Sequence, residues 1–159
     1  MTPGELRHEI VAERSAWVRE MLAQLRALPL GSFEEFAADS RNPAAAESFL
    51  RRALEALLDL GRHVLAKGFG RATTEYKEIA RALGEVELLD EDATRKLTEM
   101  AGFRNRLVHF YDQVGPQELF EISTKDAKDI DAVLDAMLAW VEAHSTKAPS
   151  DSETEPPGR

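Results

Sequence analysis

Four polar side chains lie within eight residues of one another in the stretch MAGFRNRLVHFYDQV. They are Arg104, Asn105, His109 and Tyr111. An imidazole can give or take a proton near neutral pH, and a guanidinium can bind two oxygens of a phosphate through its planar fork. Any one of these residues is ordinary on a helix surface, but the four together indicate a site where protons could be transferred at a bound anion.

The stretch is expected to be helical, and helical geometry arranges these side chains. At about 100° per residue, Arg104 and Tyr111 differ by about 20° around the axis and lie two turns apart. Asn105 and His109 are four residues apart, so the amide could hold the imidazole in one tautomer. The four side chains are therefore expected to share one edge of the helix, with His109 near its C-terminal end.

Helical periodicity also runs through the segments that must position this cluster. Apolar residues at steps of three, four and seven predict a first amphipathic helix over about 6–28, including Trp17 on its apolar stripe. A long second helix is predicted over about 44–67, with Gly68 as its stop. The second helix is expected to bury one leucine-rich face.

Three further helices are expected after the loop GFGRATT. Thr74 is predicted to cap a short helix that Gly84 stops, and Asp90 is predicted to cap the helix that carries the polar cluster. Pro116 and Thr124 lead into a last helix. Since no strand pattern appears, the sequence predicts an all-α fold, an antiparallel bundle of four to five helices.

Composition limits the domain organisation. The 159 residues with 43% hydrophobic content fit one domain over residues 1–144, and the Pro-, Ser- and Glu-rich residues 145–159 are expected to be a disordered acidic tail. No apolar run is long enough for a membrane span and no secretory signal is expected, which favours a cytoplasmic protein. The absence of cysteine excludes disulfides and sulfur-ligated metals.

The charge of the chain argues against a large nucleic-acid-wrapping surface. The formal net charge is −9, whereas binding to many phosphates requires clustered Lys and Arg. Near the polar cluster the local balance is different, because Arg95, Lys96 and Arg106 accompany Arg104 against only Glu99. These three residues are candidates for weak phosphate contacts.

A second set of polar residues suggests a metal site less convincingly. Glu55, Asp59 and His63 recur every four residues on the second helix and could be drawn as a ligand triad. They lie about 140° or more from the centre of the leucine stripe, so a solvated face or a dimer surface is the better interpretation. No metal and no cofactor are expected.

The run RNRLVHFY from Arg104 to Tyr111 resembles the R-x4-H-x-Y signature of the HepT-like toxins, a branch of the HEPN superfamily of helical ribonucleases and nucleotide-binding proteins. The likeness extends over about 44–144, through RRALEALLDLGRHVLAKGFG and the final DIDAVLDAMLAWVEAH. The motif match is complete. The first helix and the acidic tail are less similar to the family, and neither contains the proposed site.

This resemblance implies a function and a role for each site residue. Members act as toxins of toxin–antitoxin modules, as metal-independent RNA endonucleases built as homodimers with the motifs facing each other. By position, Arg104 and His109 would be catalytic and Asn105 would support His109. A minimal nucleotidyltransferase antitoxin would adenylylate Tyr111. The candidate phosphate contacts named above would then touch the RNA substrate.

Two other interpretations stay open at this stage. One is a catalytically silent HEPN-like binding module, a partner and modification target of a nucleotidyltransferase that needs Tyr111 but not His109. The acidic net charge gives this interpretation some weight, because RNA must approach a negative protein. The other is a structural helical dimer whose motif only organises the interface.

Overall fold

The computed structural model describes residues 6–145, and every regular element in this range is helical. The long helices are α1 (His8–Arg26), α3 (Arg41–Phe69), α5 (Glu91–His109) and α7 (Ala127–His144). The shorter elements are α2 (Phe33–Ala37), α4 (Tyr76–Glu85), the 3-10 turn η1 (Tyr111–Gln113), α6 (Pro116–Glu121) and the π-helical segment η2 (Ile122–Asp126). The predicted all-α fold is confirmed.

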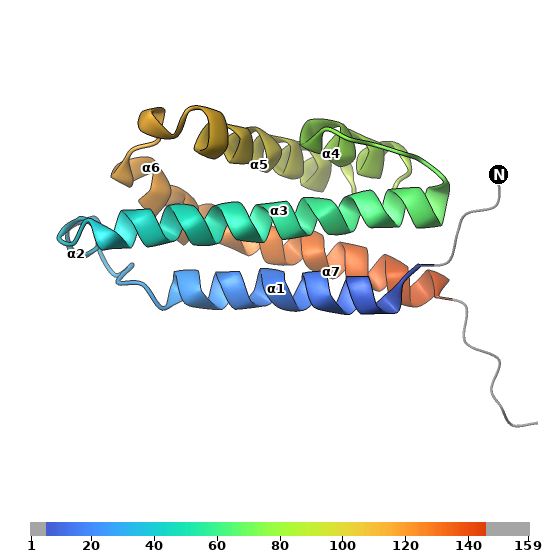
Figure 1. The fold of residues 1–159 in the computed structure, drawn as a ribbon, viewed down its shortest axis with the longest axis horizontal. Helices are drawn as coiled ribbons and strands as arrows, with labels where there is room; N and C mark the ends of the chain where they lie inside the picture. Colours follow the sequence, from blue (N-terminus) through green and yellow to red (C-terminus); the bar gives the residue numbers. More distant parts are fainter. Residues whose placement is uncertain (1–5, 146–159) are drawn as a thin grey trace, which may run out of the picture.

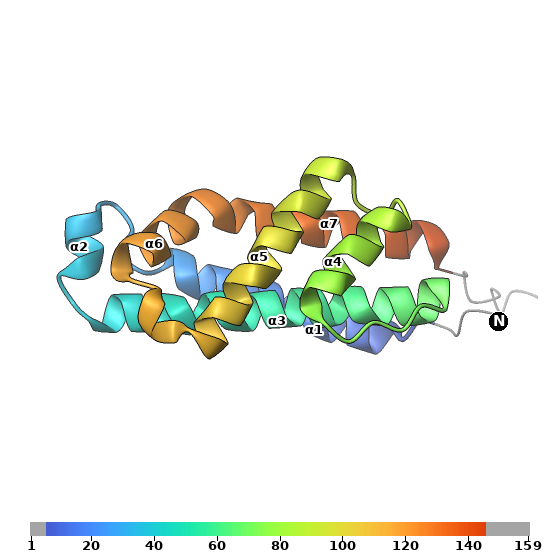
Figure 2. The ribbon, with the colours of Figure 1, turned by 90° about the horizontal axis from the view of Figure 1, so that it is seen from above.

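Helix α3 lies at the centre of the bundle and contacts all six other α-helices. Figure 1 shows α1 along one side of α3 and the α4–α5 pair along the opposite side, with α1 and α5 running opposite to α3 and α7. Seen from above in Figure 2, α5 crosses α3 obliquely, so the residues of α5 pass over the middle of α3. This crossing brings the C-terminal half of α5 against the polar face of α3.

Apolar side chains on several sides of α3 explain its central position. Leu50, Leu57, Leu58 and Leu65 are completely buried although they do not share one face, because α3 is covered from two directions. Burying each leucine contributes about 1.5–3 kcal/mol. The small residue Gly61 lets α4 and α7 approach, since a Cβ there would lie 3.0 Å from Ile79 and 3.3 Å from Met137.

Both ends of α3 extend further than its sequence pattern predicts. The helix begins at Arg41 and ends at Phe69, and Gly70 rather than Gly68 terminates it with a left-handed φ of 62°. Gly68 is inside the helix, and its missing side chain makes room for the ring of Trp140: a Cβ would lie 2.5 Å from the Cη2 atom. The prediction that Gly68 stops the helix was wrong.

The predicted boundaries of the next helix were also shifted. Glu75, not Thr74, is the N-cap of α4, and it makes no side-chain capping bond. Gly84 lies within α4, where a Cβ would meet Thr94 Oγ1 at 2.5 Å. Glu87 takes a positive φ of 61° in the connection that follows. As at Gly68, the glycine serves close packing between helices and not helix termination.

The last part of the chain is more continuously helical than expected. Pro116 begins α6 as predicted, but α6 passes through η2 into α7 without a break. Thr124 lies in η2, where its hydroxyl donates to the carbonyl of Phe120 at 2.8 Å, so it does not start a helix. The predicted acidic tail lies outside the described residues from position 146 onward.

Two further expectations concern exposure and membranes. Trp17, placed on the buried stripe of the first helix by its spacing, is 43% exposed on α1, whereas Val18 and Leu25 are completely buried. Within residues 6–145, no helix combines the length and the apolar composition that crossing a bilayer would require.

Candidate active site

Helix α5 carries the polar cluster, and both its start and its buried face are well defined. Asp90 caps the start, as predicted, by accepting a hydrogen bond from the backbone N–H of Ala93 at 2.7 Å. The buried residues of α5 are Leu97, Met100, Ala101, Phe103 and Leu107. Because these side chains anchor one face in the core, Arg104, Asn105 and His109 project from the other sides.

Arg104 is held against α3 and α4 instead of extending into solvent. Its Nε and Nη2 atoms both donate to Oε1 of Glu55, at 3.1 and 3.0 Å. Its guanidinium carbon lies 4.6 Å from the centroid of the Tyr76 ring, and Nη1 makes a longer 3.4 Å contact with Oδ1 of Asn105. The Arg104 side chain is only 20% exposed. Its orientation is therefore set by three neighbours.

This arrangement leaves part of the guanidinium available for a ligand. A guanidinium has five N–H donors, and Glu55 uses those along the Nε–Nη2 edge of Arg104. The donors on the outer Nη1–Nη2 fork have the spacing that suits two oxygens of a phosphate. Because Glu55 and the ring of Tyr76 already fix the guanidinium, it can stabilise the charge that develops on the phosphoryl oxygens without first reorganising.

A hydrogen-bonded network around Tyr76 supports this position. The Tyr76 hydroxyl donates to Oδ1 of Asp59 at 3.2 Å, and Arg62 donates to the same oxygen at 3.1 Å and to the carbonyl of Thr74 at 3.0 Å. Burial raises the pKa of Tyr76, and the charge of Asp59 raises it further. The phenol therefore stays neutral at physiological pH and keeps its donor hydrogen on Asp59.

His109 is the last residue of α5 and is exposed. Among residues 6–145 no hydrogen bond joins it to Asn105, whose Oδ1 faces Arg104 instead. Arg104 and His109, five residues apart, point about 140° apart around the helix axis. One chain therefore does not bring the guanidinium and the imidazole onto a common face.

Tyr111 lies beyond the end of the helix, which corrects the predicted register. At Phe110 the backbone leaves the helical region, with φ −135° and ψ 41°, and Tyr111 begins η1. Tyr111 is consequently not two helical turns from Arg104 on one face. Three side chains here are exposed: Val108 by 37%, Phe110 by 52% and Tyr111 by 67%. We call these three residues the α5-end patch.

A cavity of about 370 Å³ opens beside Arg104, between α3, α4 and α5. Its lining includes Arg104 and Asn105 of the motif together with residues from the other two helices. Those residues are Arg62 from α3 and Thr74, Glu75, Tyr76 and Lys77 from the start of α4. None of these five is predicted as a site residue from the sequence, because they lie 27 or more positions before the motif.

The three predicted phosphate contacts lie elsewhere and are already paired with carboxylates. Arg95 donates to Asp92 at 2.7 Å, and Lys96 lies 2.9 Å from another oxygen of Asp92. Arg106 forms a two-pronged pair with Glu118, one arm of which is 2.9 Å long. Arg106 also points about 160° away from Arg104 around α5. The structure does not bring these three cations to the side of Arg104.

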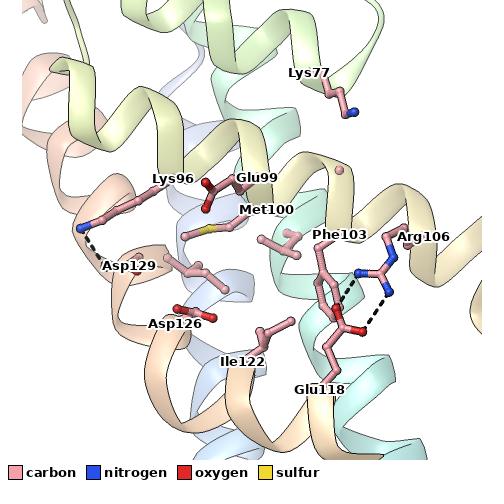
Figure 3. A pocket seen from close by; sticks show the side chains of 13 residues that line it. Lys77, Lys96, Glu99, Met100, Phe103, Arg106, Glu118, Ile122, Asp126 and Asp129 are labelled. Carbon is pink, nitrogen blue, oxygen red and sulfur yellow. Dashed lines mark hydrogen bonds and ion pairs between the residues drawn. The ribbon is translucent and has the colours of Figure 1, made fainter. Parts of the chain in front are cut away.

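Lys77, Lys96 and Arg106 line a different cavity of about 460 Å³, in which four carboxylates make the lining acidic. Figure 3 shows Glu99 and Asp126 between Lys96 and Arg106, with Lys96 paired to Asp129 at one end and Arg106 to Glu118 at the other. Burial raises the pKa of Asp126, followed by repulsion from Asp129 and Glu99. Because its carboxylates outnumber its cations, this cavity is a poor site for a polyanion.

Two residues for which the sequence predicts a solvated face or a dimer surface belong to the site network. Glu55 and Asp59 lie on the side of α3 that α4 and α5 cover, and their carboxylates bind Arg104 and Tyr76. Within the described residues no cluster of three potential metal ligands occurs. The sequence does contain two carboxylates four residues apart, opposite a leucine stripe. This spacing identifies them as counter-ions only when a helix that carries a cation is known to cross α3 at that point.

A family model described as Ribonuclease HepT-like matches residues 18–137 of the sequence. The chain belongs to the HepT-like ribonuclease family. A curated relative, the tRNA nuclease HepT of Aphanizomenon flos-aquae (strain 2012/KM1/D3), is 25% identical over 112 residues, covering 70% of this chain and 76% of the relative. The family predicted from the R-x4-H-x-Y motif is thereby confirmed.

Solved structures share the fold of this chain. A chain from the complex of the tri-AMPylated Shewanella oneidensis HEPN toxin with MNT antitoxin aligns with a TM-score of 0.74 at 18% identity, covering 82% of this HepT-like chain and 97% of that chain. The cytosolic protein YutE of Bacillus subtilis, of unknown function, aligns with a TM-score of 0.76 at 14% identity, covering 90% and 96%. At these identities the likeness establishes the HEPN-type helical fold.

Proposed function

We propose that this HepT-like protein is the RNA endonuclease toxin of a toxin–antitoxin pair, with Arg104 and His109 as its catalytic residues. The observation that carries the proposal is the fixed guanidinium of Arg104, whose outer fork is available to a phosphate beside a cavity. Family membership and the curated relative, a tRNA nuclease, agree with RNA as the substrate.

The chemistry needs one base, one acid and one anion-binding group. The 2′-hydroxyl of the RNA attacks the adjacent phosphorus and gives its proton to a neutral imidazole, while the P–O5′ bond breaks. A protonated imidazole then supplies the proton to the departing 5′-oxygen, which leaves a cyclic phosphate and a 5′-hydroxyl. The negative charge that grows on the phosphoryl oxygens is stabilised by Arg104. Because the nucleophile belongs to the substrate, the reaction proceeds without a metal.

A homodimer supplies what one chain lacks. Each chain has a single His109, and it points away from its own Arg104, so two chains are needed to give an acid, a base and a guanidinium at one phosphate. The exposed α5-end patch, next to His109, offers apolar area for such an association. Asn105 is proposed to support His109 within this dimer.

A nucleotidyltransferase antitoxin is the proposed partner, and Tyr111 is the proposed target of adenylylation. The Shewanella oneidensis relative is described as tri-AMPylated and bound to MNT antitoxin. In this chain the Tyr111 side chain is 67% exposed, so its hydroxyl is accessible to an enzyme. Adenylyl groups would place phosphodiester anions beside His109 and exclude the RNA phosphate by repulsion and bulk.

The decisive test is cleavage of a tRNA mixture by the purified protein in excess chelator, with intact mass recorded first. We expect the unmodified protein to cut and to leave 5′-hydroxyl ends, and His109→Ala or Arg104→Ala to reduce the rate at least about 1000-fold. After incubation with the partner and ATP, mass should increase in adenylyl steps and cleavage should stop. Tyr111→Phe should prevent that increase.

Three results would contradict this assignment in different ways. Cleavage that stops when chelator is added would exclude the metal-independent mechanism. An unmodified protein that binds the nucleotidyltransferase but leaves all RNA intact would favour the silent binding module. Silencing of Tyr111→Phe by a mass gain elsewhere would exclude Tyr111 as the target.

A further inference from the structure

The cavity beside Arg104 has a lining that suits an anion. Three of its side chains are cations from three different helices: Arg62 of α3, Lys77 of α4 and Arg104 of α5. Glu75 is the only carboxylate among the lining residues of this described cavity. The remaining lining residues, Thr74, Tyr76 and Asn105, all carry hydrogen-bonding groups, and none of the seven is aliphatic. A small polar anion fits this chemistry, and an apolar ligand does not.

The three cations differ in how far they are already neutralised. Glu55 binds an edge of Arg104, and Asp59 binds Arg62. Lys77, in contrast, makes no ion pair among residues 6–145. Its charge is therefore the one most available to a ligand, since an ammonium without a counter-ion attracts an anion at no cost of a broken pair.

The position of Lys77 is defined by packing even though its charge is unpaired. A Cβ built on Gly102 would lie 3.3 Å from Cε and 3.7 Å from Nζ of Lys77, so the lysine stem lies along α5 where that helix has no side chain. Figure 3 shows Lys77 on the far side of the acidic cavity from Asp126 and Asp129. Lys77 lines the acidic cavity as well as the cavity beside Arg104, so its ammonium lies between the two.

We propose that this cavity is a phosphodiester subsite, in which Lys77 and Arg62 bind an RNA phosphate next to the one held by Arg104. This inference rests on the proposed function and adds substrate-binding residues from α3 and α4. The ligand is a single strand, because the cavity of about 370 Å³ lies between three helices and has room for part of one backbone.

The subsite also explains how RNA can approach a chain of net charge −9. Three cations and one carboxylate line the cavity beside Arg104, whereas three cations, Lys77 again among them, and four carboxylates line the larger cavity. A polyanion is therefore attracted more strongly to the first cavity than to the second.

The test compares Lys77→Gln with Lys128→Gln, which removes the same charge from an exposed lysine of α7 that does not line this cavity. Binding of a fluorescent single-stranded RNA is measured as a salt titration, with each substitution in the uncleaving His109→Ala background. Cleavage is measured with each substitution alone. Intact mass confirms that Tyr111 carries no adenylyl group, so the RNA supplies the only phosphodiester.

We expect Lys77→Gln to weaken binding and raise KM about fivefold with kcat unchanged, and to lower the slope of log affinity against log salt by about 0.7, the value for one single-strand phosphate contact. Lys128→Gln should match its parent protein. Equal affinity and slope for both variants would overturn the subsite while leaving the nuclease intact. If Lys77→Gln alone loses affinity and the parent protein never cleaves RNA, the result would support the subsite and exclude the nuclease function.

Discussion

At the scale of single residues, the environment of Arg104 determines what the motif can do. A free arginine on an exposed helix would sample many rotamers, and ordering it on substrate binding would cost about 1.5–2 kcal/mol of side-chain entropy. In this structure Glu55 and Tyr76 hold the guanidinium before any ligand is present. Glu55 is thus a positioning residue for Arg104, and it also competes with the substrate phosphate for the same charge.

Substitution of Glu55 should separate these two effects. We expect Glu55→Ala to lower kcat about tenfold, because Arg104 loses its fixed orientation, without raising KM, because the competing carboxylate is gone. Glu55→Gln keeps an oxygen acceptor for Arg104 and should retain kcat within about threefold. Steady-state cleavage of one single-stranded RNA by both variants measures this difference. A Glu55→Ala enzyme with unchanged kcat would exclude the positioning role.

At the scale of the helices, glycines decide how closely the elements approach. Gly68 in α3 faces the ring of Trp140 from α7, and Gly84 in α4 faces Thr94 from α5. Gly102 in α5 faces only the flexible end of Lys77. The same residue type therefore has different structural consequences in helices that look alike in sequence.

Alanine substitutions at Gly68 and Gly102 should change stability in opposite directions. Replacing a glycine inside a helix by alanine ordinarily stabilises it by about 0.8–1 kcal/mol. At position 102 we expect a gain of about this size, since the lysine stem can move aside. At position 68 the added methyl would lie 2.5 Å from Trp140 Cη2, and overpacking should outweigh the gain, with a net loss of about 1–2 kcal/mol.

Urea denaturation of the two variants beside the parent chain measures both values. A similar gain in stability for both variants would show that helix propensity alone controls these positions and that the Trp140 contact does not constrain α3.

At the scale of the whole molecule, the α5-end patch is an apolar surface that a single chain leaves uncovered. Val108, Phe110 and Tyr111 expose apolar surface immediately around His109. Another exposed aromatic residue, Trp17, lies on α1, on the opposite side of α3 from α5 (Figure 1). The proposed dimer uses the first surface and not the second.

Introducing a charged residue into each surface tests which of the two surfaces forms the dimer. We expect Phe110→Glu to produce monomers in sedimentation experiments and to abolish cleavage, because two like charges would face each other across the dimer axis. Trp17→Glu makes the same chemical change on the far side and should leave both assembly and cleavage unaltered. A Phe110→Glu protein that remains dimeric, or an active monomer, would contradict the composite site.

The sequence by itself determined the local features of this protein. Helical periodicity, the Asp90 cap and Pro116 at the start of α6 depend on neighbours within one or two turns, so the all-α class and these helix starts could be predicted. The R-x4-H-x-Y motif likewise identified the family, because it is a contiguous pattern. The Arg104 and His109 candidates followed from that pattern and from the chemistry of their side chains.

Only the tertiary structure decided which residues meet. Glu55 binds Arg104 across 49 positions of sequence, and the ring of Trp140 packs against Gly68 from 72 positions away. Lys77 joins the site because α4 packs beside α5, and the charge of Arg106 is paired because α6 places Glu118 against it. Such contacts depend on the crossing of helices in space, and the burial and counter-ions that result cannot be obtained from the spacing of residues within one helix.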